Sequence, residues 1–167
     1  MYGVKKQEAR LATHPSLRVS GARFDLMPEG AAWLADERLL VVADLHFEKG
    51  SAFAERGIAL PPYDTRATIA RLEALVAKLK PDTLVALGDS FHDMKAAERM
   101  DAEDAARLAR LSRSLDWIRI AGHHDPVPPR ALGGAVMEEL RVRPLTLRPE
   151  PRDAPDPGQT ADPLHPR

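Results

Sequence analysis

The chain has 167 residues, of which 44% are hydrophobic and 29% are charged, a composition typical of a single soluble globular domain. Its formal net charge is −1, so no overall electrostatic field draws the chain toward nucleic acid or a membrane. The absence of cysteine excludes disulfides, thiolate zinc sites and cysteine nucleophiles, so any metal must be bound by His, Asp, Glu or Asn.

Residues 1–15 are predicted to form a flexible arm, and they lack the apolar run of a signal peptide. No stretch of the sequence approaches the roughly 18 consecutive apolar residues that a membrane-spanning helix needs. We therefore expect a cytoplasmic protein that does not interact with membranes.

Strand-like and helix-like segments then alternate along the chain. Short β-type pieces between Leu17 and Leu34 precede an apolar run at 38–43 that is typical of a buried strand. The later predicted elements are a helix over 64–79, a strand at 83–87, a helix over 101–114, a strand at 116–121 and two short strands between 135 and 147. This order predicts an α/β domain with parallel strands and right-handed crossovers.

Proline is concentrated near the C-terminus. Six of the 15 prolines lie from Pro149 onward, in a segment with almost no apolar periodicity. Such a composition is typical of disordered segments. Residues 149–167 are therefore predicted to be a disordered tail, and the folded domain is predicted to span residues 16–148.

Polar clusters follow three of the predicted apolar strands, in the sequences DLH, GDSFHD and GHHD. Parallel strands end at the same edge of a sheet, where α/β folds bind ligands. The side chains expected to meet there are Asp44, His46, Asp89, His123 and His124. Carboxylates and imidazoles suit Mn²⁺, Fe or Zn²⁺. Two such ions about 3.5–4 Å apart can hold the attacking and leaving oxygens of a phosphoryl transfer.

Each cluster alone also has a structural interpretation. An Asp after a strand often caps a helix or forms a turn, and His92 and Asp93 could serve only to fix a loop. If all three clusters had such roles, the chain would be an unrelated α/β binding domain without metal affinity. The coincidence of the clusters on three successive strand ends favours the metal site.

These clusters resemble the first three motifs of calcineurin-like metallophosphoesterases, Asp-x-His, Gly-Asp-x-x-(His/Asp) and Gly-Asn-His-Asp. The stretch VVADLHFEKGSAFAERGIALPPYDT, followed by LGDSFHD, resembles the bacterial ligase-associated DNA damage response endonuclease subfamily. The resemblance covers about residues 17–151. It implies the calcineurin-like fold, in which a βαβαβ core forms a sandwich of sheets flanked by helices. It also implies a metal-dependent phosphodiesterase or endonuclease that acts on DNA in repair.

The resemblance implies a role for each motif residue. Asp44, His46 and Asp89 would bind a first metal ion, with Mn²⁺ the ion most expected, and Asp89 would bridge to a second ion. His124 would be the catalytic histidine, which protonates the leaving oxygen or stabilises the transition state while a metal-activated hydroxide attacks the phosphorus. Asp89 and His124 are thus the predicted catalytic residues. Repair partners of the DNA ligase or helicase type are implied as well.

The sequence departs from the family pattern at the second metal position. His123 replaces the Asn of the third motif and is predicted still to bind metal through its imidazole. Pro149 and Pro163 stand where two histidine ligands are expected, so this site is predicted to be impaired. His165 is predicted to complete the first site, or else merely to lie near a disordered end. The chain also stops before several strands that relatives carry, which predicts an incomplete second sheet. The alternative function is therefore a non-catalytic family member that acts as a binding module in a repair complex.

Substrate contacts are predicted in the long loop after the first motif, where Lys49 and Arg56 are the candidate substrate-binding residues. The aromatic residues of this loop could stack on bases or cover the core beneath it; they are Phe47, Phe53 and Tyr63. Three arginines share one side of the second predicted helix and could contact phosphates or form a solvated face; they are Arg107, Arg110 and Arg113.

Overall fold

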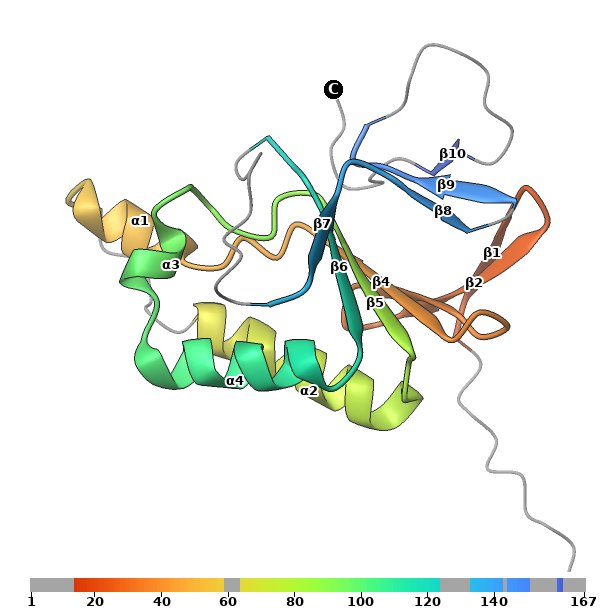
Figure 1. The fold of residues 1–167 in the computed structure, drawn as a ribbon, viewed down its shortest axis with the longest axis horizontal. Helices are drawn as coiled ribbons and strands as arrows, with labels where there is room; N and C mark the ends of the chain where they lie inside the picture. Colours follow the sequence, from red (N-terminus) through yellow and green to blue (C-terminus); the bar gives the residue numbers. More distant parts are fainter. Residues whose placement is uncertain (1–13, 59–63, 124–132, 143, 151–158, 161–167) are drawn as a thin grey trace, which may run out of the picture.

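A computed structural model of the protein describes residues 14–58, 64–123, 133–142, 144–150 and 159–160, and two sheets form its framework (Figure 1). The strands of the larger sheet lie in chain order: β1 (Ser16–Val19), β2 (Ala22–Met27), β3 (Ala31–Leu34), β4 (Leu39–Ala43), β5 (Thr83–Leu87), β6 (Asp116–Ile120) and β7 (Ala135–Met137). The smaller sheet has the spatial order β10 (Gln159–Thr160), β9 (Leu145–Leu147) and β8 (Leu140–Val142). The helices are α1 (Lys49–Glu55), α2 (Asp64–Leu79), α3 (Ala96–Arg99) and α4 (Ala102–Arg113).

The central strands of the larger sheet are parallel, as the alternation of strands and helices predicted. Strands β4, β5, β6 and β7 pair in parallel, whereas β1 to β3 add an antiparallel extension to the same sheet. The register aligns Ala43 with Leu87 and Leu87 with Ile120. The residues that follow these three positions therefore leave the sheet side by side, at one edge.

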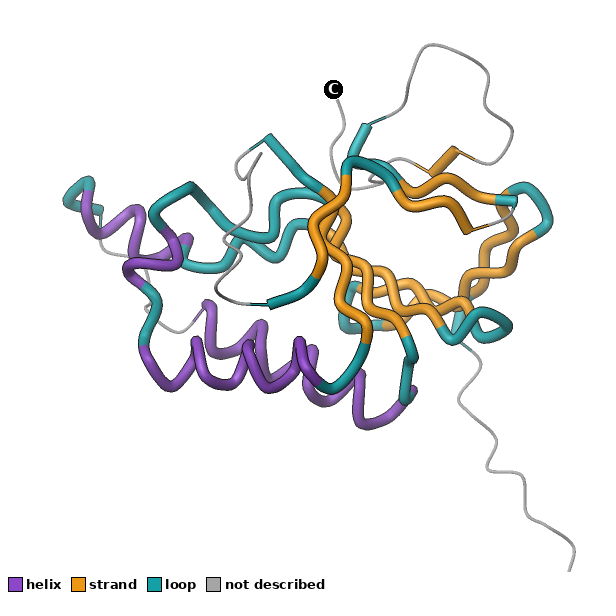
Figure 2. Tube along the Cα trace, in the orientation of Figure 1, coloured by secondary structure: helices purple, strands orange, loops and turns teal. Residues whose placement is uncertain are grey.

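Apolar side chains cover both faces of the larger sheet, which explains the continuous apolar runs. Helices α2 and α4 lie on one face and the smaller sheet lies on the other (Figures 1 and 2). Along β4, Leu40 and Val42 belong to the core on the helix side, and Leu39 and Val41 belong to the core between the sheets. The predicted α/β sandwich flanked by helices is confirmed.

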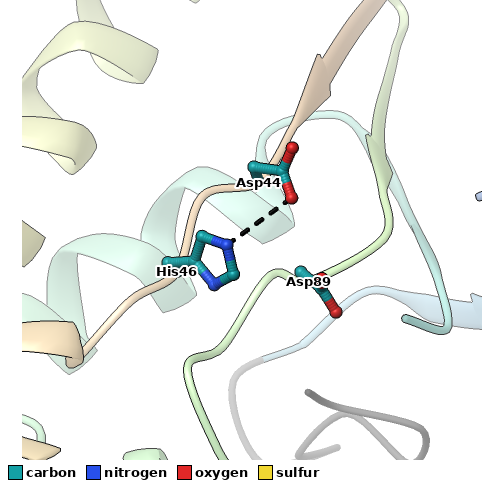
Figure 3. A group of neighbouring side chains, drawn as sticks. All are labelled: Asp44, His46 and Asp89. Carbon is teal, nitrogen blue, oxygen red and sulfur yellow. Dashed lines mark ion pairs between the residues drawn. The ribbon is translucent and has the colours of Figure 1, made fainter. Parts of the chain in front are cut away.

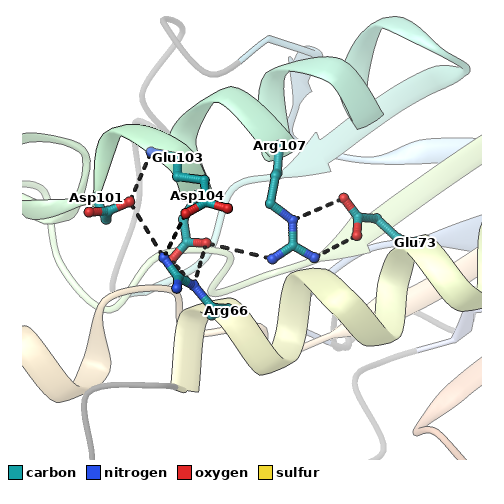
Figure 4. A network of polar contacts seen from close by, with 6 residues as sticks. All are labelled: Arg66, Glu73, Asp101, Glu103, Asp104 and Arg107. Atoms are coloured by element: carbon teal, nitrogen blue, oxygen red, sulfur yellow. Dashed lines mark hydrogen bonds and ion pairs between the residues drawn. The ribbon is translucent and has the colours of Figure 1, made fainter.

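A network of ion pairs joins α2 to α4 (Figure 4). Arg66 donates to Asp104 at 3.1 Å, and Arg107 donates to both carboxylate oxygens of Glu73, at 3.3 and 2.6 Å. The hydrogen bond from Arg107 lowers the pKa of Glu73 and outweighs the opposing effect of burial. Arg107 therefore joins two helices, and this pairing favours a structural role over the predicted phosphate contact.

Local structure differs from the sequence-based expectation in three places. The short helices α1 and α3 were not predicted, and three strands rather than two lie between residues 135 and 147. Strand β10 falls within the predicted tail and pairs in parallel with β9. Strands β7 and β10 pair with residues 13 or more positions away, which local periodicity does not report. Residues 1–13, 151–158 and 161–167 lie outside the described residues, and among the described helices none is long and apolar enough to cross a membrane.

Candidate metal centre

Two adjacent strand ends bring Asp44, His46 and Asp89 together (Figure 3). Asp44 directly follows β4, and Asp89 lies two residues beyond β5. One ligand atom of each residue lies within 4.8 Å of the others, and Nε2 of His46 is 3.5 Å from Oδ1 of Asp44. The convergence that the strand-end clusters predicted is therefore present for these three side chains.

Backbone hydrogen bonds extend the pairing of β4 and β5 into the loops that carry these residues. The His46 N–H donates to the Asp89 carbonyl at 3.0 Å, and the Phe47 N–H donates to the Ser90 carbonyl at 2.9 Å. The His92 N–H donates back to the Phe47 carbonyl at 3.0 Å. The loops thus keep the register of the strands, which holds the backbone that carries the three candidate ligands.

The backbone of this centre adopts an unusual conformation. The φ angles of Asp44, His46 and Asp89 are 51°, 44° and 38°, in the left-handed region that residues with a Cβ rarely occupy. Each such residue costs about 1–2 kcal/mol relative to the right-handed conformation. Backbone strain concentrates at functional sites, where the surrounding structure holds it in place. Seven non-glycine residues in the described part of the chain have a positive φ, and the three candidate ligands are all among them, which points to function.

The end of β6 reaches the centre because Gly122 has no side chain. A Cβ at this position would overlap the backbone nitrogen and a carboxylate oxygen of Asp89. The third motif therefore needs glycine at this position, because the end of β6 lies too close to Asp89 to leave room for a side chain.

The second half of the centre, formed by the end of β6 with His123 and by Pro149, differs from the first half in the side chains it presents. The ring of Pro149 lies beside Gly88, since a Cβ built on Gly88 would be 3.4 Å from the Pro149 Cβ. The His123 side chain is 70% exposed, and its Nε2 is 2.8 Å from Oε1 of Glu150. Among the described residues, His123 is not part of the group formed by the three candidate ligands. The predicted metal contact of His123 stays a prediction.

Two predicted site residues, His124 and His165, lie outside the described residues, as does Pro163. The roles assigned to them by resemblance therefore stay predictions.

A polar cluster centred on Arg99 supports the loop that carries Asp89. Arg99 is largely buried and donates to Asp93 at 2.8 Å and to the Ser51 hydroxyl at 3.1 Å, and the Ser51 hydroxyl donates to Glu48 at 2.6 Å. Burial raises the pKa of Asp93, but the hydrogen bonds from Arg99 and the Lys95 backbone N–H outweigh it, so the pKa lies below its ordinary value.

The cluster ties α1 and α3 to the second motif. Sequence reasoning missed Arg99 because its partner Ser51 is 48 residues away.

Two of the loop aromatics, Phe47 and Phe53, pack against other rings of the protein. Phe47 is buried, and its ring centroid is 5.7 Å from that of Phe91. The prediction that Phe47 stacks on a base is therefore wrong, and the alternative, that it covers the core, is confirmed. Phe53 lies against the ring of His92, with centroids 5.6 Å apart, and His92 in turn makes an edge contact with His46 at 5.8 Å.

The predicted substrate-binding residues of this loop lie on α1. Lys49 is exposed at the first residue of the helix. Arg56 is exposed at its C-terminal end, with its guanidinium carbon 6.0 Å from the centroid of the Phe53 ring. Tyr63 lies outside the described residues. Both cations remain candidates for phosphate contacts.

The donor set fits a divalent transition-metal ion. Two carboxylates and one imidazole suit Mn²⁺, Fe or Zn²⁺. These three donors are the ones that the described residues contribute, and His165, the predicted fourth ligand, lies outside that part of the chain.

Comparison with known proteins identifies the family. The family model for calcineurin-like phosphoesterases matches residues 37–158. The chain belongs to the calcineurin-like phosphoesterase family. The match spans all three strand-end motifs, so the family predicted from them is confirmed.

Two relatives of this phosphoesterase are informative. The crystal structure of Pseudomonas putida nuclease MPE is similar with a TM-score of 0.70 and 25% sequence identity, over 89% of this chain and 72% of that chain. The probable inactive purple acid phosphatase 29 of Arabidopsis thaliana is 28% identical over 93 residues, which are 53% of this chain. The matched region is only 23% of the plant protein. The relatives thus include one named as a nuclease and one named as inactive.

Proposed function

We propose that this protein is a metal-dependent phosphodiesterase that hydrolyses nucleic acid, with DNA as its substrate in repair. The observation that carries the proposal is the convergence of Asp44, His46 and Asp89 at one sheet edge of a calcineurin-like phosphoesterase domain. The similarity to a structure named as a nuclease supports a phosphodiester substrate. A cytoplasmic location and repair partners of the ligase or helicase type stay predictions from the sequence.

The chain's own residues would prepare the reaction. A bound divalent ion, for which we propose Mn²⁺, supplies Lewis acidity toward phosphate oxygens and lowers the pKa of water. Asp44, His46 and Asp89 would hold the ion, and the paired loops would keep these donors oriented so that little reorganisation is needed. We assign to His124 the protonation of the leaving oxygen, and to Lys49 and Arg56 contacts with substrate phosphates.

We further propose that the second metal position is impaired. Pro149 lies beside Gly88 without a ligand atom, and the exposed imidazole of His123 has its Nε2 2.8 Å from Oε1 of Glu150. His165 would complete the first site. One ion retains the Lewis-acid role, but the clamp on both the attacking and the leaving oxygen needs two. A single tight ion per chain and slow turnover are therefore expected.

The test is hydrolysis of bis(p-nitrophenyl) phosphate with and without Mn²⁺ by the wild type, Asp89→Asn and Asp25→Asn. Loss of a direct ligand exceeds the effect of losing an outer contact, so Asp89→Asn is expected to lower activity by about 100-fold or more. Asp25 pairs only with Arg23 among the described residues and is the matched control, expected to leave activity unchanged. Hydrolysis that survives Asp89→Asn contradicts the proposal.

The second candidate function is a non-catalytic binding module in a repair complex. The proline at position 149 and the relative named as inactive favour it. Calorimetric titration with Mn²⁺ separates the two functions when it is read beside the hydrolysis assay. A chain that binds at most one ion and hydrolyses no phosphodiester supports the binding module, and two tight ions contradict it.

A further inference from the structure

A cavity of about 220 Å³ opens beside Asp44, on the helix side of the larger sheet. The end of β4, the turn between β2 and β3 and one face of α2 enclose it. Glu29 lines it from the turn, and Thr68 and Arg71 line it from the helix. We call it the β4–α2 cavity. It adjoins the candidate metal centre through Asp44, which lines the cavity and is one of the three candidate ligands.

Arg71 is the cationic residue of the β4–α2 cavity. Its side chain is exposed, and within the part of the chain that the structure describes it makes neither an ion pair nor a hydrogen bond. Arg66, one and a half turns earlier on α2, is instead engaged with Asp104. The guanidinium of Arg71 is thus available for an anion that enters the cavity.

The size of the cavity indicates a part of a larger substrate. Pockets that enclose whole drug-sized ligands measure roughly 300–1,000 Å³, and this cavity is smaller. A substrate whose reacting phosphate lies at Asp44 can place only its neighbouring group there.

The chemistry of the lining matches one nucleotide unit. A guanidinium pairs well with the oxygens of a phosphate. The Glu29 carboxylate and the Thr68 hydroxyl can accept hydrogen bonds from the amino group of a base or a sugar hydroxyl. Leu45 and Leu72 provide an apolar surface for the face of a base.

We propose that the β4–α2 cavity is a subsite for the nucleotide next to the scissile phosphate, with Arg71 binding the phosphate of that nucleotide. This inference rests on the proposed phosphodiesterase function and adds a binding site for the nucleotide that neighbours the scissile phosphate. The substrate is a polynucleotide, and a small phosphodiester leaves the subsite empty. Arg71 then contributes to binding of the extended substrate and not to metal binding.

The test compares Arg71→Ala with Lys78→Ala on two substrates. Lys78 is an exposed cation on the same helix, seven residues or about 10 Å further along its axis and outside the cavity. Arg71→Ala is expected to raise KM for a single-stranded DNA oligonucleotide about 10-fold, which is the effect of one charge-assisted hydrogen bond. Hydrolysis of bis(p-nitrophenyl) phosphate and Mn²⁺ affinity are expected to stay within about two-fold, as is every value for Lys78→Ala.

Binding of the labelled oligonucleotide, measured by fluorescence anisotropy at several salt concentrations, needs no turnover. Arg71→Ala is expected to reduce the slope of log K against log[salt] by about 0.7, the value for one lost contact with a single strand. An unchanged KM and slope overturn the inference, as does an equal loss on both substrates. Failure of the wild type to hydrolyse either substrate counts against the proposed function, whereas failure to bind the oligonucleotide overturns the subsite.

Discussion

The two halves of the candidate metal centre are built differently. The half at the ends of β4 and β5 is held by backbone hydrogen bonds between its loops, and its Asp89 is buried. The half at the end of β6 presents His123 to solvent, paired with an exposed Glu150, and has Pro149 beside Gly88.

This difference shows that strand register continued into the loops is what positions the candidate metal ligands. In the first half, strand register continues into the loops, so the positions of Asp44, His46 and Asp89 are set by the sheet itself. In the second half, the backbone of β6 also approaches closely, through Gly122, but among the described residues no side chain of this half joins the group. Within the part of the chain that the structure describes, both strand ends thus reach the centre, and the donor atoms gather at the ends of β4 and β5.

The largest expected effect comes from Gly122→Ala, which disrupts the close contact between Gly122 at the end of β6 and Asp89 after β5. The added methyl group would overlap Asp89 and force it out of place. We expect Mn²⁺ affinity, measured by calorimetry, to fall by about 100-fold or more. The free energy of unfolding is expected to fall by about 1–3 kcal/mol, the usual cost of overpacking.

Gly57→Ala is the matched control for this variant. Gly57 has a φ of 78° but open space around its missing Cβ, so alanine costs only the backbone strain of about 1–2 kcal/mol and leaves Mn²⁺ affinity unchanged. If Gly122→Ala binds Mn²⁺ as tightly as the wild type, the end of β6 is not pressed against Asp89.

Pro149→His is the next test, because it supplies a donor to the half that lacks one. The new imidazole would lie beside Gly88 and near Asp89. We expect calorimetry to record a second, weaker Mn²⁺ binding event, so that the stoichiometry rises from about one toward two ions per chain. Pro149→Phe adds a ring without a ligand atom and should leave one event. Two events already present in the wild type would show that the second half is functional as it stands.

Asp93→Asn, which weakens the support of the first half, has the smallest expected effect. The amide keeps the shape but loses the charge that faces Arg99. About a third of the Asp93 side chain is exposed, so water screens the pair, and we expect a loss of about 1 kcal/mol in unfolding free energy. Mn²⁺ affinity should fall by up to about 10-fold, as is usual for residues that orient a ligand. Urea titration and calorimetry measure the two effects.

The pH dependence of stability gives a second measurement on the same variant. The pKa of Asp93 lies below its ordinary value of 3.8, so its carboxylate stabilises the fold above about pH 3.8. This contribution is lost as the pH falls through the lower pKa of the folded state. The difference in stability between wild type and Asp93→Asn should therefore vanish in strong acid, and a difference that persists there would show that the Asp93 charge is not its origin.

The sequence by itself determined the parallel core and the position of the first half of the centre. Strands covered on both faces must be apolar throughout, so their ends are visible as the first polar residues after each run, and Asp44 and Asp89 are such residues. Parallel pairing then requires these ends to meet. The family resemblance followed from the same positions.

Only the tertiary structure decided which further residues belong to the centre. Arg99 acts on Ser51 and Asp93, Gly122 approaches Asp89, and Arg71 shares a cavity with Asp44. Each of these contacts joins different elements or loops, most of them far apart in the sequence. Local periodicity reports which face of a strand or helix is buried, but it carries no information on which distant side chain lies opposite. That information exists only once the strands have paired and the helices have packed on the sheet.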